Sequence, residues 1–176
     1  MIDTLITSKT RIKLLLKFFL NPENSAHLRG LESEFGESSN AIRLELNRLE
    51  GADMLHSKLL GNRKLFRVNA KHPLYNDINS IVKKYFGLDV IIEWIANRMG
   101  NLKAVYLTGD IAKGKDVGLI DLILIGDIDQ QYLLTLIEKA EKLIKRKIRY
   151  LIYSEEEFNM SRERENGALL VWGNPT

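Results

Sequence analysis

An acidic residue on an apolar strand, placed after a glycine turn, is the feature of this sequence that could do chemistry. The segment from Ala104 to Asp127 reads AVYLTGDIAKGKDVGLIDLILIGD. It comprises an apolar strand, a turn at Gly109, a short polar connection and a second apolar strand that carries Asp121. Carboxylates on such strands can hold divalent cations, which gather phosphate oxygens and neutralise charge during nucleotide transfer. The segment is therefore a candidate site for phosphate chemistry.

The segment resembles the minimal nucleotidyltransferase family, whose pattern is roughly G-S-x-A-x-G, a spacer, then D-x-D-L-x-x-x-G. Six positions match this pattern: Gly109, Ala112, Gly114, Asp121, Leu122 and Gly126. Two positions depart from it, because Asp110 replaces a phosphate-contacting Ser and Leu119 replaces the first Asp of the pair. The resemblance implies a small α/β nucleotidyltransferase-like domain at the C-terminal end.

The departures remove groups that this reaction needs. Two carboxylates separated by one residue on a strand face the same side and clamp the cation together, and Leu119 cannot supply its half. The family usually takes a third carboxylate from a later strand, whereas the candidate strand KIRYLIYS offers Arg149 or Tyr150. Asp110 would also place negative charge near phosphate, which a partly desolvated pocket disfavours. We therefore expect no catalytic residue, no metal site and no resident cofactor.

Two other interpretations of this segment stay open. In the first, Gly109, Asp110, Lys113 and Asp121, with Asp116 as a further candidate, bind a small ligand, magnesium or a nucleotide without chemistry. In the second, the chain is a nucleotidyltransferase with an altered metal site made of Asp110 and Asp121, with Lys113 directed to phosphate. The simplest interpretation is a structural unit that keeps the turn, because Asp residues in loops are more often turn formers than ligands.

A second set of candidate residues is the polar side of a helix that Ser38 or Ser39 caps and that runs to about Glu50. Its outward positions carry Asn40, Arg43 and Asn47. Asn can pair with adenine, and Arg with guanine, through two hydrogen bonds each. The neighbours that suit phosphate oxygens are Ser38, Ser39 and Arg48. This spacing predicts a helix that reads base edges of double-stranded DNA, although a polar helix face can also be merely solvated.

A basic hairpin is predicted to follow, with strands Met54–Leu59 and Lys64–Asn69. The connection Leu60-Gly61-Asn62-Arg63 suits a tight turn, because Gly and Asn tolerate positive φ. The cations on this hairpin are Lys58, Arg63, Lys64 and Arg67. We expect Lys58, Arg63 and Lys64 to contact DNA.

Two earlier helices must position the polar one. The first follows a cap at Ser8 or Thr10 and ends at Asn21-Pro22, since proline cannot continue a helix. The second is expected from Ala26 to Phe35, and Gly36 breaks the chain after it. The side chains predicted to face the core of this region are Ile12, Leu15, Leu16, Phe19, Leu28, Leu31, Phe35, Ile42, Leu46 and Leu49.

The order helix, helix, helix, hairpin is that of a winged helix-turn-helix. It resembles the arsenic-repressor-like regulators over about the first 70 residues, in the order and spacing of elements. The resemblance implies transcription regulation in a prokaryotic cell, with a wing that touches phosphates or the minor groove.

The expected fold is α+β, with an N-terminal winged helix-turn-helix at residues 1–72 and the nucleotidyltransferase-like domain at residues 101–176. Residues 73–100 are expected to form two connecting or dimerisation helices, ending at Gly87 and about Met99, with Asp89 as the cap of the second. A homodimer is expected, because many helix-turn-helix proteins bind paired half-sites. The elements expected further on are strands near Lys103–Leu107 and Leu119–Ile125, a helix Asp129–Lys145, a strand Lys147–Tyr153, a helix opened by a capping box at Ser154, and an unassigned apolar tail Ala168–Trp172.

Composition narrows the function classes. The chain has no cysteine, which excludes disulfides and thiolate metal sites, and the three histidines lack ligand spacing. The net charge is +3, whereas the part up to Tyr75 carries 12 Lys and Arg against 8 Asp and Glu, the sign that phosphate binding requires. No apolar run is long enough for a membrane span, so a cytoplasmic protein is expected. The sequence thus predicts a DNA-binding regulator with an inactive second domain, the alternatives being the altered enzyme or a protein-binding adaptor.

Overall fold

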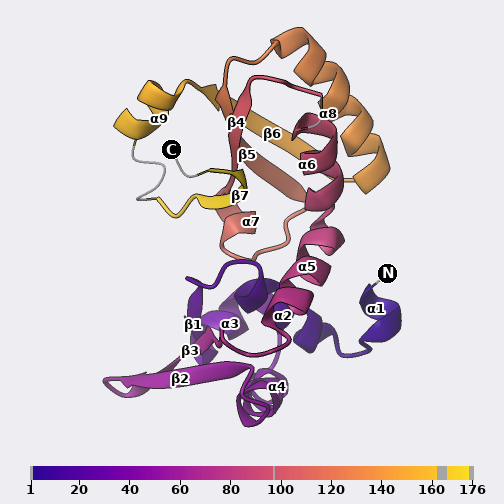
Figure 1. Ribbon diagram of the computed structural model, residues 1–176. Coiled ribbons are helices and arrows are strands. Elements are labelled where there is room, and N and C mark those ends of the chain that lie inside the picture. The colour runs from indigo at the N-terminus through magenta and orange to yellow at the C-terminus, as the bar shows by residue number, and fades with distance from the viewer. Residues whose placement is uncertain (1, 97, 162–165, 175–176) are drawn as a thin grey trace. The chain divides into compact units, whose positions relative to one another are not determined.

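The computed structural model describes residues 2–96, 98–161 and 166–174. Its internal contacts divide the chain into two compact units, Met1–Tyr85 and Phe86–Thr176. Both units contain helices and strands (Figure 1), and each unit has a sheet of its own. The predicted α+β class is confirmed. Among the described residues, no helix is both long and apolar enough to cross a membrane.

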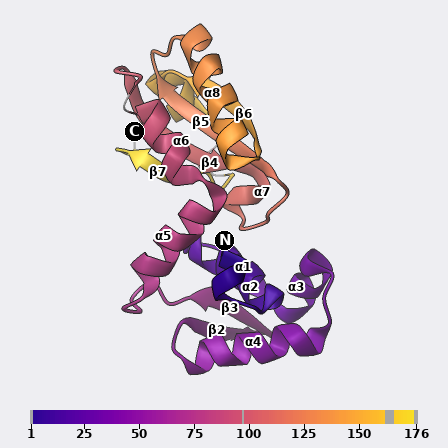
Figure 2. The same ribbon diagram turned by 90° about the vertical axis from the view of Figure 1, so that its right-hand side faces the viewer.

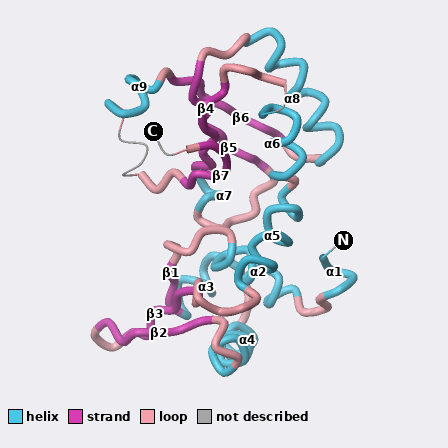
Figure 3. Tube along the Cα trace, in the orientation of Figure 1, coloured by secondary structure: helices cyan, strands magenta, loops and turns pink. Residues whose placement is uncertain are grey.

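The first unit is a winged helix-turn-helix (Figure 3). Its elements are α1 (Ile2–Leu5), α2 (Lys9–Phe19), β1 (Ser25–His27), α3 (Leu28–Phe35), α4 (Ser39–Gly51), β2 (Leu55–Leu60), β3 (Arg63–Val68) and α5 (Tyr75–Phe86), whose last residue is assigned to the second unit. The strands form an antiparallel sheet in the order β1-β3-β2. Strands β2 and β3 form the wing, and α4 occupies the position of the recognition helix.

Local capping explains where these helices begin and end. The Ser8 hydroxyl accepts a hydrogen bond from the Arg11 amide at 3.2 Å, so Ser8 rather than Thr10 caps α2. Gly36 adopts a left-handed φ of 65° at the end of α3, and Ser38 caps α4. Helix α4, expected to run to about Glu50, ends one residue later at Gly51, with Ala52 as its cap.

The second helix starts later than predicted. Ala26 was expected to open it, but Ser25–His27 pairs with β3 and Ala26 lies opposite Phe66. Strand pairing outweighs the helical pattern here, so α3 begins at Leu28. Leu31 is fully buried as predicted, whereas Leu28 and Phe35 are only partly buried.

The core of the first unit consists of the inward faces of α2, α3 and α4 and one face of the small sheet. Its side chains include Leu14, Phe18, Phe19, Leu31, Ile42, Leu46, Leu49, Leu55 and Phe66. Asn79 on α5 donates its side-chain amide to the Phe19 carbonyl at 2.6 Å, which satisfies a free carbonyl at the end of α2. The apolar stripe of α4 is therefore buried in this core, and its polar side faces outward.

The second unit has a mixed sheet in the order β6-β5-β4-β7, in which β5 and β6 run parallel and the other pairs antiparallel. Its elements are α6 (Leu88–Ala96), β4 (Leu102–Thr108), α7 (Gly109–Ala112), β5 (Leu119–Gly126), α8 (Gln130–Ile144), β6 (Lys147–Tyr153), α9 (Glu155–Met160) and β7 (Leu169–Gly173). The order of β4, glycine turn, α7 and β5 is the arrangement that the nucleotidyltransferase resemblance implies. The unassigned tail forms the edge strand β7.

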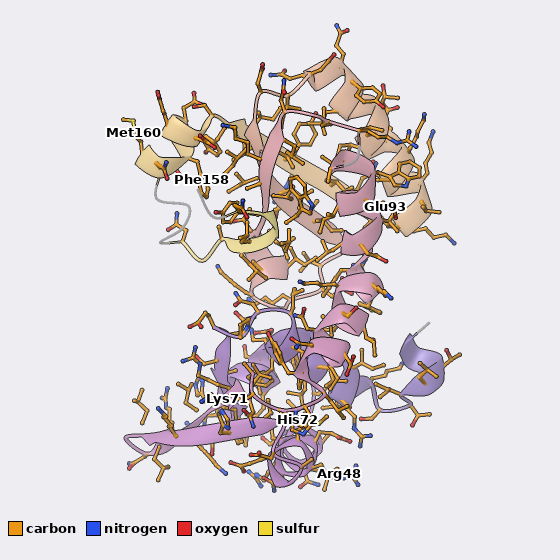
Figure 4. The ribbon with its side chains drawn as sticks, in the orientation of Figure 1. Arg48, Lys71, His72, Glu93, Phe158 and Met160 are labelled. Atoms are coloured by element: carbon orange, nitrogen blue, oxygen red, sulfur yellow. The ribbon has the colours of Figure 1, made fainter. Side chains whose placement is uncertain are left out.

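Helices cover both faces of this sheet. Helices α6 and α8 lie side by side on one face (Figure 2). On the other face α9 places Phe158 against Tyr106 and Ile123 (Figure 4). The capping box predicted at Ser154 is confirmed, with Glu157 as its partner. Helix α6 begins at Leu88, so Asp89 lies in its first turn and the expected cap there is wrong.

The expected three-part division of the chain stays a prediction. Helix α5 belongs to the first unit except for Phe86, and α6 belongs to the second. The segment 73–100 is thus shared between the two units. Asn97 lies outside the described residues.

Candidate functional site

A hollow of about 470 Å³ lies in the first unit between α4, the start of α3 and the wing. Its polar lining consists of His27, Arg29, Arg43, Asn47, Asn62, Arg63 and Lys64. Four of these residues, Arg43, Asn47, Arg63 and Lys64, are predicted DNA contacts that lie on two separate elements. The fold brings them to one concave, strongly basic surface.

The outward face of α4 is fully accessible. Asn40, Arg43 and Asn47 are exposed, while the opposite stripe of α4 is buried against the core. Arg48 also lies at the outer side of α4 (Figure 4). The Ser38 hydroxyl accepts a hydrogen bond from the Ala41 amide at 3.3 Å, so it serves as a helix cap. Helix α4 therefore presents hydrogen-bonding side chains that the core does not use.

The cations of this surface fall into two groups. Arg48 pairs with Glu45 at 3.0 Å and Lys64 pairs with Glu50 at 2.6 Å. Arg29, Arg43 and Lys58 form no ion pair with any residue in the described parts of the chain.

Arg63 lies beside a histidine ring instead of an acid. Its Nη1 lies 3.5 Å from the ring nitrogen Nε2 of His27. Lys58 lies opposite Leu65, nearer the base of the wing than Arg63, and is exposed. Arg29, Arg43 and Arg63 form no ion pair with an acid among the described residues, so no ion pair has to break before they bind an anion. They are therefore the strongest candidates for anion binding.

The cations of α2 have a structural role. Arg11, Lys13 and Lys17 pair with Glu45, Glu37 and Glu34 at 2.8, 2.7 and 2.8 Å, respectively. Burial alone would raise the pKa of Glu45, but hydrogen bonds from Arg11 and Ser8 outweigh it and lower that pKa. These pairs join α2 to α3, to the connection between α3 and α4, and to α4, and they neutralise the three acids.

Sequence reasoning missed His27, Arg29 and Asn62. His27 ends β1 and Arg29 lies in the first turn of α3, so their position depends on the pairing of β1 with β3. The apolar pattern of a three-residue strand is too short to reveal that pairing. The one available signal was the placement of Arg29 at the start of the second helix.

The glycine turn of the second unit closes directly onto Asp121. Gly109 has a φ of 69°, and a Cβ there would lie 2.5 Å from Oδ2 of Asp121. The parallel register places Asp121 opposite Arg149. The Arg149 guanidinium donates to both carboxylate oxygens, with Nε at 2.6 Å and Nη2 at 3.0 Å. This hydrogen bond raises the pKa of Arg149.

The predicted ligand residues are only partly brought together. Gly109 and Asp121 line a hollow of about 650 Å³ with Arg149 and Tyr150, whereas Asp110 and Lys113 are not among its lining residues. Asp110 lies 3.9 Å from Lys115, and Asp116 pairs with Arg146. Within the described residues, no three His, Asp or Glu side chains gather as metal ligands. Asp121 already shares both oxygens with an arginine and has Leu119 in place of a second acid, so these residues do not fit a divalent cation.

No family model matches the sequence, and no curated protein matches it. Similar solved structures include a MntA–HpeT toxin–antitoxin complex, with 15% identity and a TM-score of 0.41, over 50% of this chain and 73% of the other. Reduced HlyU from Vibrio cholerae is 13% identical over 49% of this chain and 83% of its own, with a TM-score of 0.38. A candidate nucleotidyltransferase from Sulfolobus solfataricus is 20% identical over 55% of this chain and 86% of its own, with a TM-score of 0.36. Each likeness covers about half of this chain.

Proposed function

We propose that the chain is a DNA-binding regulator of transcription whose first unit binds the duplex and whose second unit does not transfer nucleotides. One observation carries this proposal: Arg29, Arg43 and Arg63 converge on a single hollow beside the exposed polar face of α4. None of the three is paired with an acid within the described residues.

In the proposed complex α4 enters the major groove. Arg43 and Asn47 face base edges, where Arg prefers guanine and Asn adenine. Arg29, Lys58 and Arg63 contact phosphates on either side. Ser38, Ser39, Asn40, Arg48 and Lys64 complete the interface at its edge. Lys64 contributes less than Arg43, because its ammonium group is already neutralised by Glu50.

The second unit has a non-catalytic role in this proposal. Its one acid on β5, Asp121, is held by Arg149, so it is not free to take a magnesium ion. For an altered enzyme to bind magnesium here, Asp121 would have to separate from Arg149, and a second carboxylate would have to lie beside Asp121. We infer that the unit serves self-association, partner binding or ligand sensing.

Selection from a random duplex pool tests the proposal. The selected duplex is then titrated by fluorescence anisotropy at two salt concentrations, with and without magnesium-ATP. Specific binding that weakens steeply with salt supports the regulator, since released counterions accompany each phosphate contact. Selection of no duplex, or incorporation of labelled nucleotide into any acceptor, would contradict it.

We propose that the chain acts as a homodimer. A single small module rarely supplies enough DNA affinity, and two copies can bind half-sites about one helical turn apart. Mass measurement of the free protein and of its complex with a two-half-site duplex tests this. One copy on a palindromic duplex at saturation would exclude it.

A further inference from the structure

The end of the wing carries two adjacent leucines that lie outside the core. Leu59 is 78% exposed and Leu60 is 71% exposed. Both stand directly before the two-residue turn Gly61-Asn62, in which Gly61 has a φ of 59°. Single exposed apolar residues are ordinary on protein surfaces, but this pair places one apolar side chain on each face at the end of the hairpin, so that the end as a whole is apolar. We call residues 59–63 the wing tip.

Cations surround this apolar end on both faces of the hairpin. Leu60 lies opposite Arg63, and Leu59 lies opposite Lys64. Residues opposite each other share a face and successive residues alternate, so each leucine is accompanied by one cation. The hairpin from Leu55 to Val68 contains no Asp or Glu. Its charge therefore suits a polyanion whose interior is apolar.

Duplex DNA is such a polyanion, because its stacked bases lie between two phosphate backbones. Arg63 and Lys64 also line the hollow that holds Arg43 and Asn47, so the wing tip continues the proposed DNA surface. The minor groove is only about 6 Å wide, which admits single side chains rather than a whole element. Leucine is among the residues that proteins insert there between base steps.

We propose that Leu59 and Leu60 form a wedge that enters the minor groove beside the major-groove site, partly unstacks one base step and bends the duplex. Arg63 holds a flanking phosphate, and Lys64 contributes less because it pairs with Glu50 at 2.6 Å. This inference rests on the proposed function and adds to it a deformation of the DNA. Base steps that unstack easily, such as pyrimidine–purine steps, would then be preferred at a position that no polar side chain reads.

The test uses the full chain and the selected duplex, with 2-aminopurine placed in turn at each step of the flanking sequence and dyes at both ends. The unchanged chain is expected to raise 2-aminopurine fluorescence at one step and to bend the duplex by about 20–90°. The variant Leu59→Ser/Leu60→Ser is expected to lose both signals and to bind about tenfold more weakly, because buried leucine surface is lost while the unstacking cost is saved.

A matched control removes two leucines from another exposed surface. Leu134 and Leu143 on α8 are 51% and 59% exposed. The variant Leu134→Ser/Leu143→Ser is expected to unstack and bend the duplex like the unchanged chain. Circular dichroism of both variants establishes that they fold, which is expected because all four leucines are exposed.

Four results would overturn the wedge. Specific binding without unstacking or bending would remove it and leave the DNA-binding proposal intact. Unstacking that persists in Leu59→Ser/Leu60→Ser would assign the deformation to other residues. Unchanged DNA binding by that variant, together with loss of self-association or of binding to anionic vesicles, would assign the leucines to a second copy or to a lipid surface. Absence of any duplex binding by the unchanged chain would contradict the proposed function itself, and the wedge with it.

Discussion

At the scale of single residues, the pair Asp121–Arg149 distinguishes this chain from the nucleotide-transfer pattern that it resembles. An arginine stands at the later-strand position where that pattern calls for an acid, and it lies within hydrogen-bond distance of the remaining one. The guanidinium thus supplies the positive charge that a cation would otherwise bring to Asp121. From the sequence, Arg149 and Tyr150 were both candidates for this position. The parallel register of β5 and β6 places Arg149 opposite Asp121.

The first prediction concerns ligand binding at this pair. Isothermal titration of the full chain with magnesium-ATP is expected to show no difference between the unchanged protein and Asp121→Asn, because Asp121 is already engaged. The double variant Leu119→Asp/Arg149→Asp restores acids at both missing positions, and we expect it to gain magnesium binding. Magnesium-dependent ATP binding that disappears in Asp121→Asn would support the altered-enzyme interpretation.

The second prediction concerns Gly109. Its φ of 69° and the 2.5 Å approach of a Cβ to Asp121 Oδ2 leave no room for a side chain. Gly109→Ala is expected to lower the free energy of unfolding by about 1–3 kcal/mol, measured by urea denaturation. Gly51→Ala is the control, because Gly51 lies in α4 with no atom within 4 Å of the added Cβ. It is expected to stabilise the chain by about 0.5–1 kcal/mol.

If Gly51→Ala lowered the free energy of unfolding as much as Gly109→Ala does, the turn at Gly109 would have no special constraint.

At the scale of elements, ion pairs join α2 to α3 and α4 and so fix the position of α4. Glu45 is 5% exposed and contacts Arg11, Ser8 and Arg48. Its partners thereby join the start of α2 to the middle of α4. The same contacts keep its negative charge away from the phosphates that α4 is proposed to approach.

The third prediction is a pH dependence of this arrangement. Burial would raise the pKa of Glu45, but the hydrogen bonds from Arg11 and Ser8 lower it below its ordinary value of 4.5. A lowered folded pKa means that the carboxylate stabilises the fold above about pH 4.5 and ceases to do so as the pH falls through the folded value. Glu45→Gln is expected to cost about 1–3 kcal/mol at neutral pH, because charged hydrogen bonds are lost at a buried site.

Urea denaturation measures the effect between about pH 3 and pH 7, a range that brackets the ordinary pKa of a glutamate carboxyl group. Glu45→Gln should flatten the acid side of the stability profile. Glu138→Gln, at an exposed position on α8, is the control. An unchanged acid limb in Glu45→Gln would show that the pairs of Glu45 do not contribute.

Elements with long apolar periodicity were predictable, and the short ones were not. Helices α2, α4 and α8 and strands β4, β5 and β6 follow from spacing, caps and turn residues. Strand β1, with three residues, and helix α7, with four, depend on partners distant in the sequence, which local pattern does not encode. The exposed residues Asn40, Arg43 and Asn47 were placed correctly on α4, whereas the contribution of α3 to the hollow required the pairing of β1 with β3.

At the scale of the whole molecule, charge is distributed unevenly between the two units. The chain has a net charge of +3, and the part up to Tyr75 alone carries +4 from 12 Lys and Arg against 8 Asp and Glu. Such a small excess cannot bind nucleic acid by charge alone, so the position of each cation matters more than their number. Three arginines that line one hollow and form no ion pair with an acid among the described residues are such a placement.

The fourth prediction concerns salt. Each phosphate contact that is lost reduces the dependence of binding on salt by about one counterion. Arg63→Ala is expected to reduce the slope of log K against log salt concentration by about 1 for every duplex, specific or random. Lys84→Ala, a lysine on α5 with no predicted DNA contact, should leave the slope unchanged. Equal slopes for Arg63→Ala and the unchanged chain would remove Arg63 from phosphate contact.

Competition between the selected duplex and random duplex, measured for the unchanged chain and for Arg43→Ala, tests the central claim that α4 reads DNA sequence. Arg43→Ala is expected to weaken binding to the selected duplex by about 1–3 kcal/mol and to relax the preference for one base pair. Its affinity for random duplex should change far less. An equal loss on both duplexes, or no loss on either, would contradict base reading by α4.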